Sequence, residues 1–408
     1  MTVKDLCAYM IKVGSADMYL TTGLPPVFKI SGQSKPVGKT SLTSQHTEHF
    51  ANSIMNEKQR IEFREIMEMN LSLSYPDLGA RFRVNILRQR GDAMIVVRII
   101  PGEILSTEKL KLPSTLNKMI MGKRGLLLVV GGTGSGKSTT LAAMIDYRNR
   151  NEAGHIITVE DPLEFVHPHK KSVITQREIG TDSLSFKNAL RNMLRQSPDV
   201  ILVGEIRDLE TMEAALTFAE TGHLCIGTLH ANNANQAVER VMGFFEQEQH
   251  KQIYQQLSLN LQGIISQRLV RTPDGGRAAA VEIMINSPRI ADMIMQAKIG
   301  EIKMAMEQGA QDGMQTFDMA LVKLVKEGRI DPEQAIANAD SGNEVRLRLK
   351  MDKLEGGGEE AMDELMGEAK GLTFNEAKIV DPVEEMKKEK ERKKRQEEMR
   401  EQRKKKKK

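Results

Sequence analysis

The amino-acid sequence predicts an α/β protein in which a small mixed domain precedes a larger domain built on a parallel sheet. Apolar strand-like segments alternate with helical stretches after Gly125, as in doubly wound sheets covered by helices. These segments are Leu126–Val130, Ile156–Glu160, Val200–Gly204 and Leu224–Thr228. Before residue 100, short strand-like segments are separated by Gly and Pro residues. After about Arg268 the pattern becomes mostly helical.

The first hundred residues carry the signals of the mixed domain. An opening amphipathic helix places Leu6, Met10 and Val13 on one face. Strands are expected near Asp17–Thr21, Val27–Ile30, Arg81–Asn85 and Ala93–Ile100. We therefore expect an N-terminal domain at 1–100, a linker at 101–124, a sheet core at 125–268, a helical C-terminal portion at 269–350 and a charged, disordered tail at 351–408.

Composition narrows the class of protein. The 408 residues contain no apolar run of about eighteen and no secretory leader pattern, so we expect a cytoplasmic location. The two cysteines, Cys7 and Cys225, are too far apart in sequence for a disulfide framework or a cysteine-ligated zinc. The net charge is +4, but residues 384–408 alone carry 14 Lys/Arg against 7 Asp/Glu, so the preceding chain is mildly acidic. This balance disfavours a broad nucleic-acid-binding surface.

The most specific motif is a complete G-x-x-x-x-G-K-[ST] phosphate loop, placed directly between an apolar strand and a helix. Its glycines let backbone N–H groups approach a phosphate, and the helix that follows presents its N-terminus to the same anion. Lys137 is expected to neutralise the β- and γ-phosphates, and Ser138 to bind Mg²⁺. The predicted nucleotide-binding residues of this loop are Gly131, Gly132, Thr133, Gly134, Ser135, Gly136, Lys137, Ser138 and Thr139. The motif predicts ATP and Mg²⁺ as ligands.

Three polar clusters follow the phosphate loop in a fixed order. They are Ile157–His167, Ser197–Asp208 and Thr221–Asn233. With the phosphate loop as Walker A, they resemble the Asp box, Walker B segment and His box of the secretion ATPase superfamily. Within it, the chain resembles the type IV pilus retraction ATPases of the PilT/PilU family, because Met18–Pro26, Ala80–Asn85, Gln176–Glu178 and Gly313–Asp318 are similar to segments of that family.

Further details favour the PilU branch of this family. Ser287-Pro288 is followed by Arg289–Met293, where PilT proteins carry an AIRNL-type sequence. The chain also lacks the tetracysteine module and the large N-terminal extension of many assembly ATPases. The resemblance therefore implies an accessory role beside a PilT motor, with a PAS-like N-terminal domain and a RecA-like ATPase domain.

The resemblance also assigns roles to the polar clusters. Glu164 resembles the catalytic glutamate, Glu205 is expected to bind Mg²⁺ through water, and His230 to sense the γ-phosphate. Glu160 and Asp161 are expected to support nucleotide binding, and His223 to hold its loop. The arginine candidates for contacts with the phosphates are Arg81, Arg83 and Arg98.

The implied partners are five further copies in a homo-hexamer, a PilT-like ATPase and an inner-membrane pilus platform protein. These place the chain at the inner face of the cytoplasmic membrane. Two alternatives remain: a nucleotide-binding adaptor without motor activity, and a RecA-like nucleic-acid ATPase. The acidic body and the scarcity of aromatic residues, 11 Phe, 5 Tyr and no Trp, disfavour the second, so no nucleic acid is expected as a partner.

Overall fold

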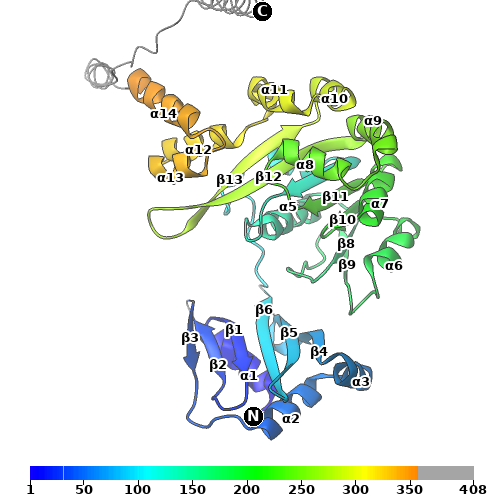
Figure 1. Cartoon of the computed structure of the whole chain (residues 1–408), viewed down its shortest axis with the longest axis vertical. Coiled ribbons are helices and arrows are strands. Elements are labelled where there is room, and N and C mark those ends of the chain that lie inside the picture. The colour runs from blue at the N-terminus through cyan, green and yellow to red at the C-terminus, as the bar shows by residue number, and fades with distance from the viewer. Residues whose placement is uncertain (31, 101, 357–408) are drawn as a thin grey trace, which may run out of the picture. The chain divides into compact units, whose positions relative to one another are not determined.

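The computed structural model describes residues 1–30, 32–100 and 102–356, and it contains two sheets with their helices (Figure 1). The α/β class predicted from the sequence is confirmed. The charged tail predicted for residues 351–408 lies outside the described residues from residue 357 onward. Among the described residues, no helix is long and apolar enough to cross a membrane.

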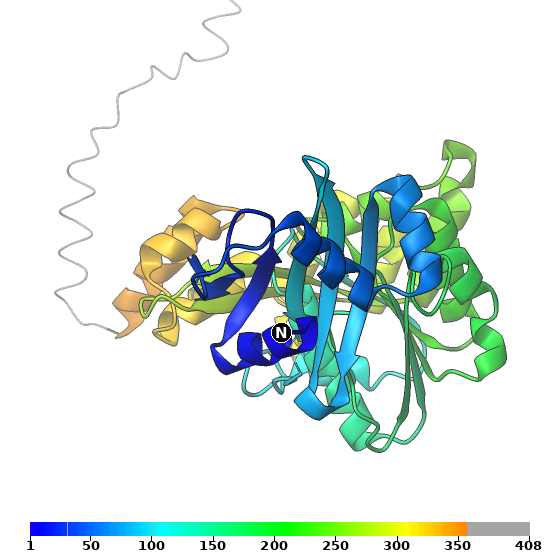
Figure 2. The same cartoon turned by 90° about the horizontal axis from the view of Figure 1, so that it is seen from below.

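The N-terminal region is an antiparallel sheet in the order β3-β2-β1-β6-β5-β4. Its strands are β1 (Ser15–Leu20), β2 (Val27–Ile30), β3 (Gln33–Pro36), β4 (Glu68–Tyr75), β5 (Ala80–Gln89) and β6 (Asp92–Ile100). Three helices accompany them: α1 (Val3–Lys12), α2 (Ser44–Ile54) and α3 (Glu57–Ile66), drawn in blue in Figure 2. Phe82, Val84 and Ile86 alternate along β5 and are fully buried, so this strand packs one face into the core.

The second sheet has the order β13-β12-β7-β11-β10-β8-β9. Its strands are β7 (Gly125–Val130), β8 (His155–Glu160), β9 (Val173–Glu178), β10 (Val200–Val203), β11 (Leu224–Leu229), β12 (Leu261–Arg271) and β13 (Arg277–Ile285). All neighbouring strands are parallel except β12 and β13, which form an antiparallel hairpin. Parallel strands are buried on both faces, which explains the continuous apolar runs of β7, β10 and β11.

Helices cover both faces of this sheet. Leu127 and Val129 of β7 share an apolar cluster with α4 and α5, whereas Leu126 and Leu128 share another with α6 to α11. The helices are α4 (Thr115–Ile120), α5 (Lys137–Asn151), α6 (Phe186–Arg191), α7 (Leu209–Glu220), α8 (Ala234–Met242), α9 (His250–Asn260), α10 (Pro288–Met295), α11 (Ile302–Gln308), α12 (Phe317–Lys326), α13 (Pro332–Asn338) and α14 (Gly342–Gly356). Short 3₁₀ turns occupy Pro76–Leu78, Met193–Gln196, Gln247–Gln249, Ile299–Glu301 and Ala310–Asp312.

The boundary predicted at residue 268 is wrong, because it falls inside β12. The sheet continues through β13 to Ile285, and the helical portion begins only at α10. Ser266, Gln267 and Arg268 interrupt the apolar pattern of β12, so this strand does not resemble the preceding ones in sequence. The helical portion expected from the sequence follows as α10 to α14.

The close pairing of β12 and β13 generates a prediction about stability. A Cβ atom at Gly263 would lie 2.4 Å from the backbone oxygen of Met284, so Gly263→Ala must displace one strand. We expect this substitution to lower the free energy of unfolding by about 1–3 kcal/mol, as overpacking does. Urea unfolding followed by circular dichroism would measure it.

Gly300→Ala is the matched control, because a Cβ atom there meets nothing within 4 Å. Equal unfolding midpoints for the two variants would contradict the predicted clash.

Candidate active site

The phosphate loop connects β7 to α5 and requires glycine at two positions. Gly136 has a φ of +88°, and a Cβ atom there would lie 2.7 Å from Nε2 of Gln267. Gly131 has a φ of +154°, and a Cβ atom would lie 2.5 Å from Oγ of Ser135. Any larger side chain would therefore combine backbone strain with a clash. The loop brings the N-terminus of the 15-residue helix α5 to the edge of the sheet.

Lys137 lies folded over the loop that precedes it. Its Nζ atom donates to the backbone oxygens of Gly131, at 2.8 Å, and Gly132, at 3.0 Å. Burial lowers the pKa of Lys137, while the nearby charges of Glu205 and Glu164 oppose this shift. The ammonium group is thus partly desolvated and poised for an anion.

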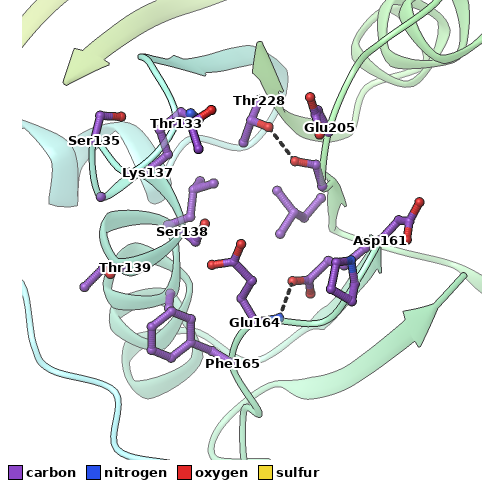
Figure 3. Close-up of a pocket in the computed structure, with 18 of the residues that line it drawn as sticks. Thr133, Ser135, Lys137, Ser138, Thr139, Asp161, Glu164, Phe165, Glu205 and Thr228 are labelled. Carbon is purple, nitrogen blue, oxygen red and sulfur yellow. Dashed lines mark hydrogen bonds between the residues drawn. The ribbon is translucent and has the colours of Figure 1, made fainter. Parts of the chain in front are cut away.

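A cavity of about 760 Å³ opens beside the loop, at the carboxyl ends of the parallel strands. The predicted residues that line it are Arg83, Thr133, Gly134, Ser135, Gly136, Lys137, Ser138, Thr139, Glu160, Asp161, Glu164, Glu205 and His230. Figure 3 shows the carboxylate of Glu164 directed into this cavity on the side of Ser138, while Asp161 turns away from it. The structure therefore brings residues from four sequence motifs to one place.

Glu205 is the centre of a charged group at the end of β10. Its carboxylate lies 2.5 Å from Nη2 of Arg207 and 3.0 Å from Nε2 of His230. Burial alone would raise the pKa of Glu205, but the hydrogen bond and charge of Arg207, with smaller contributions from His230 and Lys137, hold it below the usual value. Glu205 is therefore ionised at neutral pH and can attract a cation or its water shell.

Gln176 on β9 fixes the loop that carries Glu164. Its Nε2 donates to the backbone oxygen of Phe165 at 2.9 Å, and its Oε1 accepts from the backbone N–H of His167 at 2.7 Å. Glu160, at the end of β8, accepts a 2.7 Å bond from Thr158, and burial raises its pKa. Sequence reasoning singled out Gln176 only as part of a resemblance, because its role depends on the pairing of β8 with β9.

Gln267 is a second residue that sequence reasoning missed. This buried side chain on β12 accepts from Oγ1 of Thr140 at 2.7 Å and donates from Nε2 to the backbone oxygen of Ser135 at 2.9 Å. It therefore ties the phosphate loop to the first turn of α5. No motif places it there, since it lies more than a hundred residues beyond the loop.

Besides Gly131 and Gly132 at the start of the phosphate loop, three predicted residues do not line this cavity. His223 precedes β11, at the edge of the sheet opposite the cavity, where its Nδ1 lies 3.1 Å from Oγ1 of Thr221. His223 therefore shapes the turn before β11 and does not line the cavity. Arg81 pairs with Glu178, and Arg98 lies 2.6 Å from Asp17, so neither contributes to the cavity within this chain.

The donor set fits Mg²⁺ held largely by nucleotide phosphates and water. Ser138 supplies a hydroxyl beside the N-terminus of α5, and the carboxylates of Glu164 and Glu205 supply oxygen acceptors. Among residues 1–30, 32–100 and 102–356, no cluster of three His, Cys, Asp or Glu side chains could by itself enclose a metal ion. Mg²⁺ typically binds one or two protein oxygens and keeps phosphate oxygens and water as its other ligands.

Comparison with known proteins decides the family. Residues 52–337 match the Type II/IV secretion system protein family. The chain is 47% identical to the type IV pilus ATPase PilU of Pseudomonas aeruginosa over 375 residues, 92% of this chain and 97% of PilU. The chain belongs to the PilT/PilU family of type IV pilus ATPases.

Other members of the PilT/PilU family support the same assignment. PilT of Pseudomonas aeruginosa is 44% identical over 335 residues, 82% of this chain and 97% of PilT. The crystal structure of the pilus retraction motor PilT with bound ADP has a TM-score of 0.79 and 42% identity, covering 84% of this chain and 98% of PilT. The fold described above is therefore that of a PilT/PilU ATPase.

The two hydrogen bonds by which Gln176 holds the loop of Glu164 lead to a prediction about the ATPase activity. Gln176→Ala removes both bonds to the loop of Glu164, so we expect kcat for ATP hydrolysis to fall by about tenfold or more, because small displacements of a positioning group cost up to 10²-fold. The affinity for ADP should change little, because the phosphate loop is untouched. Steady-state turnover and calorimetric ADP binding would measure both quantities.

Gln252→Ala is the matched control, since this glutamine is exposed on α9. Wild-type turnover in the Gln176 variant would show that the loop holds its position without these two hydrogen bonds.

Proposed function

We propose that this chain hydrolyses ATP in a Mg²⁺-dependent manner, as a subunit of a hexameric motor that powers or assists type IV pilus retraction. Within this function it acts as a PilU-like partner of a PilT-like ATPase, at the inner face of the cytoplasmic membrane and against the pilus platform protein. The family supports the ATPase activity. The higher identity to PilU, and over a larger share of the chain, supports the accessory role.

One observation carries the catalytic part of the proposal. Glu164 directs its carboxylate into the same cavity that Lys137 and Ser138 line, on the side of Ser138 (Figure 3). Hydrolysis requires a cationic phosphate site and a group that orients or deprotonates the attacking water. We propose Lys137 and Glu164 for these two roles, and the cavity volume of about 760 Å³ is sufficient for a nucleotide.

Each polar residue then has a proposed role. Lys137 leaves its backbone partners and binds the β- and γ-phosphates, while Ser138 and Glu205 hold the metal site. Mg²⁺ bound there would neutralise charge on the β- and γ-phosphates. Glu164 accepts the proton of the attacking water, and His230 contacts the γ-phosphate. Glu160 and Asp161 support this constellation.

The arginine candidates complete the proposed clamp around the phosphates. Arg83 lines the cavity and is proposed to approach the nucleotide within this chain. Arg81 and Arg98 remain candidates only for the nucleotide of a neighbouring subunit, since both are paired within their own chain. The hexamer supplies such neighbours in the proposed assembly.

The decisive experiment measures ATP turnover, nucleotide affinity and molecular mass of the purified protein and its variants. Glu164→Gln should lower kcat by about 10²–10⁴-fold with little change in nucleotide affinity, because only the proton acceptor is lost. Lys137→Ala should abolish turnover and weaken ATP binding. Glu213→Gln, an exposed position on α7, is the matched control and should retain full activity.

A wild-type protein that binds ATP without turnover would instead favour the nucleotide-binding adaptor. Pilus retraction in cells with weakened PilT separates the two functions further. The motor proposal requires that Lys137→Ala abolish retraction there, whereas an adaptor would retain its effect in the Glu164→Gln variant.

A further inference from the structure

We propose that Arg268 on β12 is a positioning residue that couples the loop carrying His230 to the connection between α13 and α14. The inference rests on the proposed function in one respect, the role of His230 at the γ-phosphate. The observations behind the inference are the contacts of the guanidinium group of Arg268.

The loop after His230 is held from β12 and β13. The backbone N–H of Ala234, the first residue of α8, donates to Oε1 of Glu282 at 2.7 Å, and Oγ of Ser266 donates to the same oxygen at 3.0 Å. Glu282 is 3% exposed and therefore has little freedom to move. Two residues earlier, the backbone oxygen of Asn232 accepts from Nη2 of Arg268 at 3.3 Å. The loop is thus anchored at both ends of a three-residue segment.

The same guanidinium group reaches the end of α13. Nη1 of Arg268 donates to the backbone oxygen of Asn338 at 2.9 Å, and Nη2 lies 2.7 Å from Oδ1 of Asp340. Its plane also lies over the ring of Phe317, 3.9 Å from the ring centroid. A guanidinium group that makes charge-assisted hydrogen bonds and stacks on a buried ring has a fixed orientation.

Asp340 belongs to a second ion-pair cluster that fixes the α13–α14 connection. Its backbone N–H donates to Oδ1 of Asp318 at 2.8 Å, and Nζ of Lys303 lies 3.0 Å from Oδ2 of Asp318 and 3.7 Å from Oδ2 of Asp340. Asp318 is fully buried at the start of α12. Displacement of the loop at Asn232 therefore acts on a connection that is itself tied to α11 and α12.

The proposed coupling between the two segments begins at the nucleotide site. His230 lies 3.0 Å from Glu205, and two residues further along the chain the oxygen of Asn232 meets Arg268. When His230 leaves Glu205 for a γ-phosphate, the loop must shift, and Arg268 transmits the shift to Asp340. Conversely, a partner that moves the α13–α14 connection changes the position of His230. Reciprocity of this kind is required of any coupling between two sites.

The test uses the full-length protein and a double-mutant cycle. We expect Arg268→Gln to lower kcat about tenfold, an effect within the range found for residues that carry coupling, with less than a twofold change in KM for ATP. Arg268→Lys should not restore the rate, because an ammonium group cannot serve three acceptors in one plane. In the Arg268→Gln background, His230→Asn should cost little more, since contacts in one network are not additive.

Arg271→Gln, at the exposed end of the same strand, is the matched control and should leave kcat unchanged. Asp340→Asn is the second variant. It removes the charge pair between Arg268 and Asp340 and leaves the bond between Arg268 and Asn232. It therefore tests the proposed coupling if the Arg268→Gln variant does not fold. Wild-type kcat in both folded variants, or fully additive losses with His230→Asn, would overturn the proposal.

A readout without turnover separates this proposal from the proposed function. Hydrogen–deuterium exchange of residues 336–346 should slow when the wild-type protein binds the non-hydrolysable analogue AMP-PNP with Mg²⁺. This protection should be lost in Arg268→Gln and in His230→Asn, and retained in Arg271→Gln. If the wild-type protein shows this exchange pattern but does not hydrolyse ATP, the proposed motor function is wrong and the proposed coupling is supported. If exchange in the wild-type protein does not depend on the nucleotide, the proposed coupling is wrong.

Discussion

The parallel pairing of β12 with β7 is the constraint on which the geometry of the nucleotide site depends. β7 carries the phosphate loop, and it lies between β11, which precedes His230, and β12. Successive residues of a strand point to opposite faces of the sheet. Gln267 therefore reaches the phosphate loop and α5 from one face. From the other face, Arg268 bonds directly to the loop before α8, and Ser266 acts on it through Glu282. One short segment of β12 therefore holds the phosphate loop from one face and the loop that follows His230 from the other.

The glutamates at the carboxyl ends of the parallel strands differ in their expected roles because their surroundings differ. Burial raises the pKa of Glu160, and the charge of Glu164 adds to this shift, while the hydrogen bond from Thr158 opposes it. Glu205 faces Arg207, His230 and Lys137, so its pKa is lowered although it is also partly buried. The same residue type therefore supplies a structural acceptor at one strand end and an ionised carboxylate at the next. Glu164 differs from both, because it lies on a loop that Gln176 holds in position and that also bonds to Glu160 through the backbone N–H of Glu164 at 3.5 Å.

The sequence predicted the parts of this site that are local in the chain. The phosphate loop, Glu164, Glu205 and His230 follow strands whose apolar runs are readable, and the structure brings them to one cavity. His223 lies away from the cavity, because the six residues of β11 separate it from His230 and place the two ends of one sequence motif at opposite ends of that strand. The supporting residues were not predictable for a related reason. Gln176 acts through the pairing of β9 with β8, and Gln267 and Arg268 act through the pairing of β12 with β7, contacts that no local pattern encodes.

The position of Lys137 links this architecture to nucleotide binding. Its ammonium group bonds to two neutral carbonyl oxygens of its own loop, and burial lowers its pKa. A phosphate group offers negatively charged acceptors, which attract the ammonium group by charge as well as by hydrogen bonding, whereas the carbonyl oxygens are neutral. An anion therefore relieves the desolvation of Lys137 and releases the carbonyl oxygens of Gly131 and Gly132. Gln267 holds the carbonyl of Ser135 in the same loop. The loop backbone therefore stays in place when Lys137 changes its partners, and its N–H groups keep their orientation toward the phosphate.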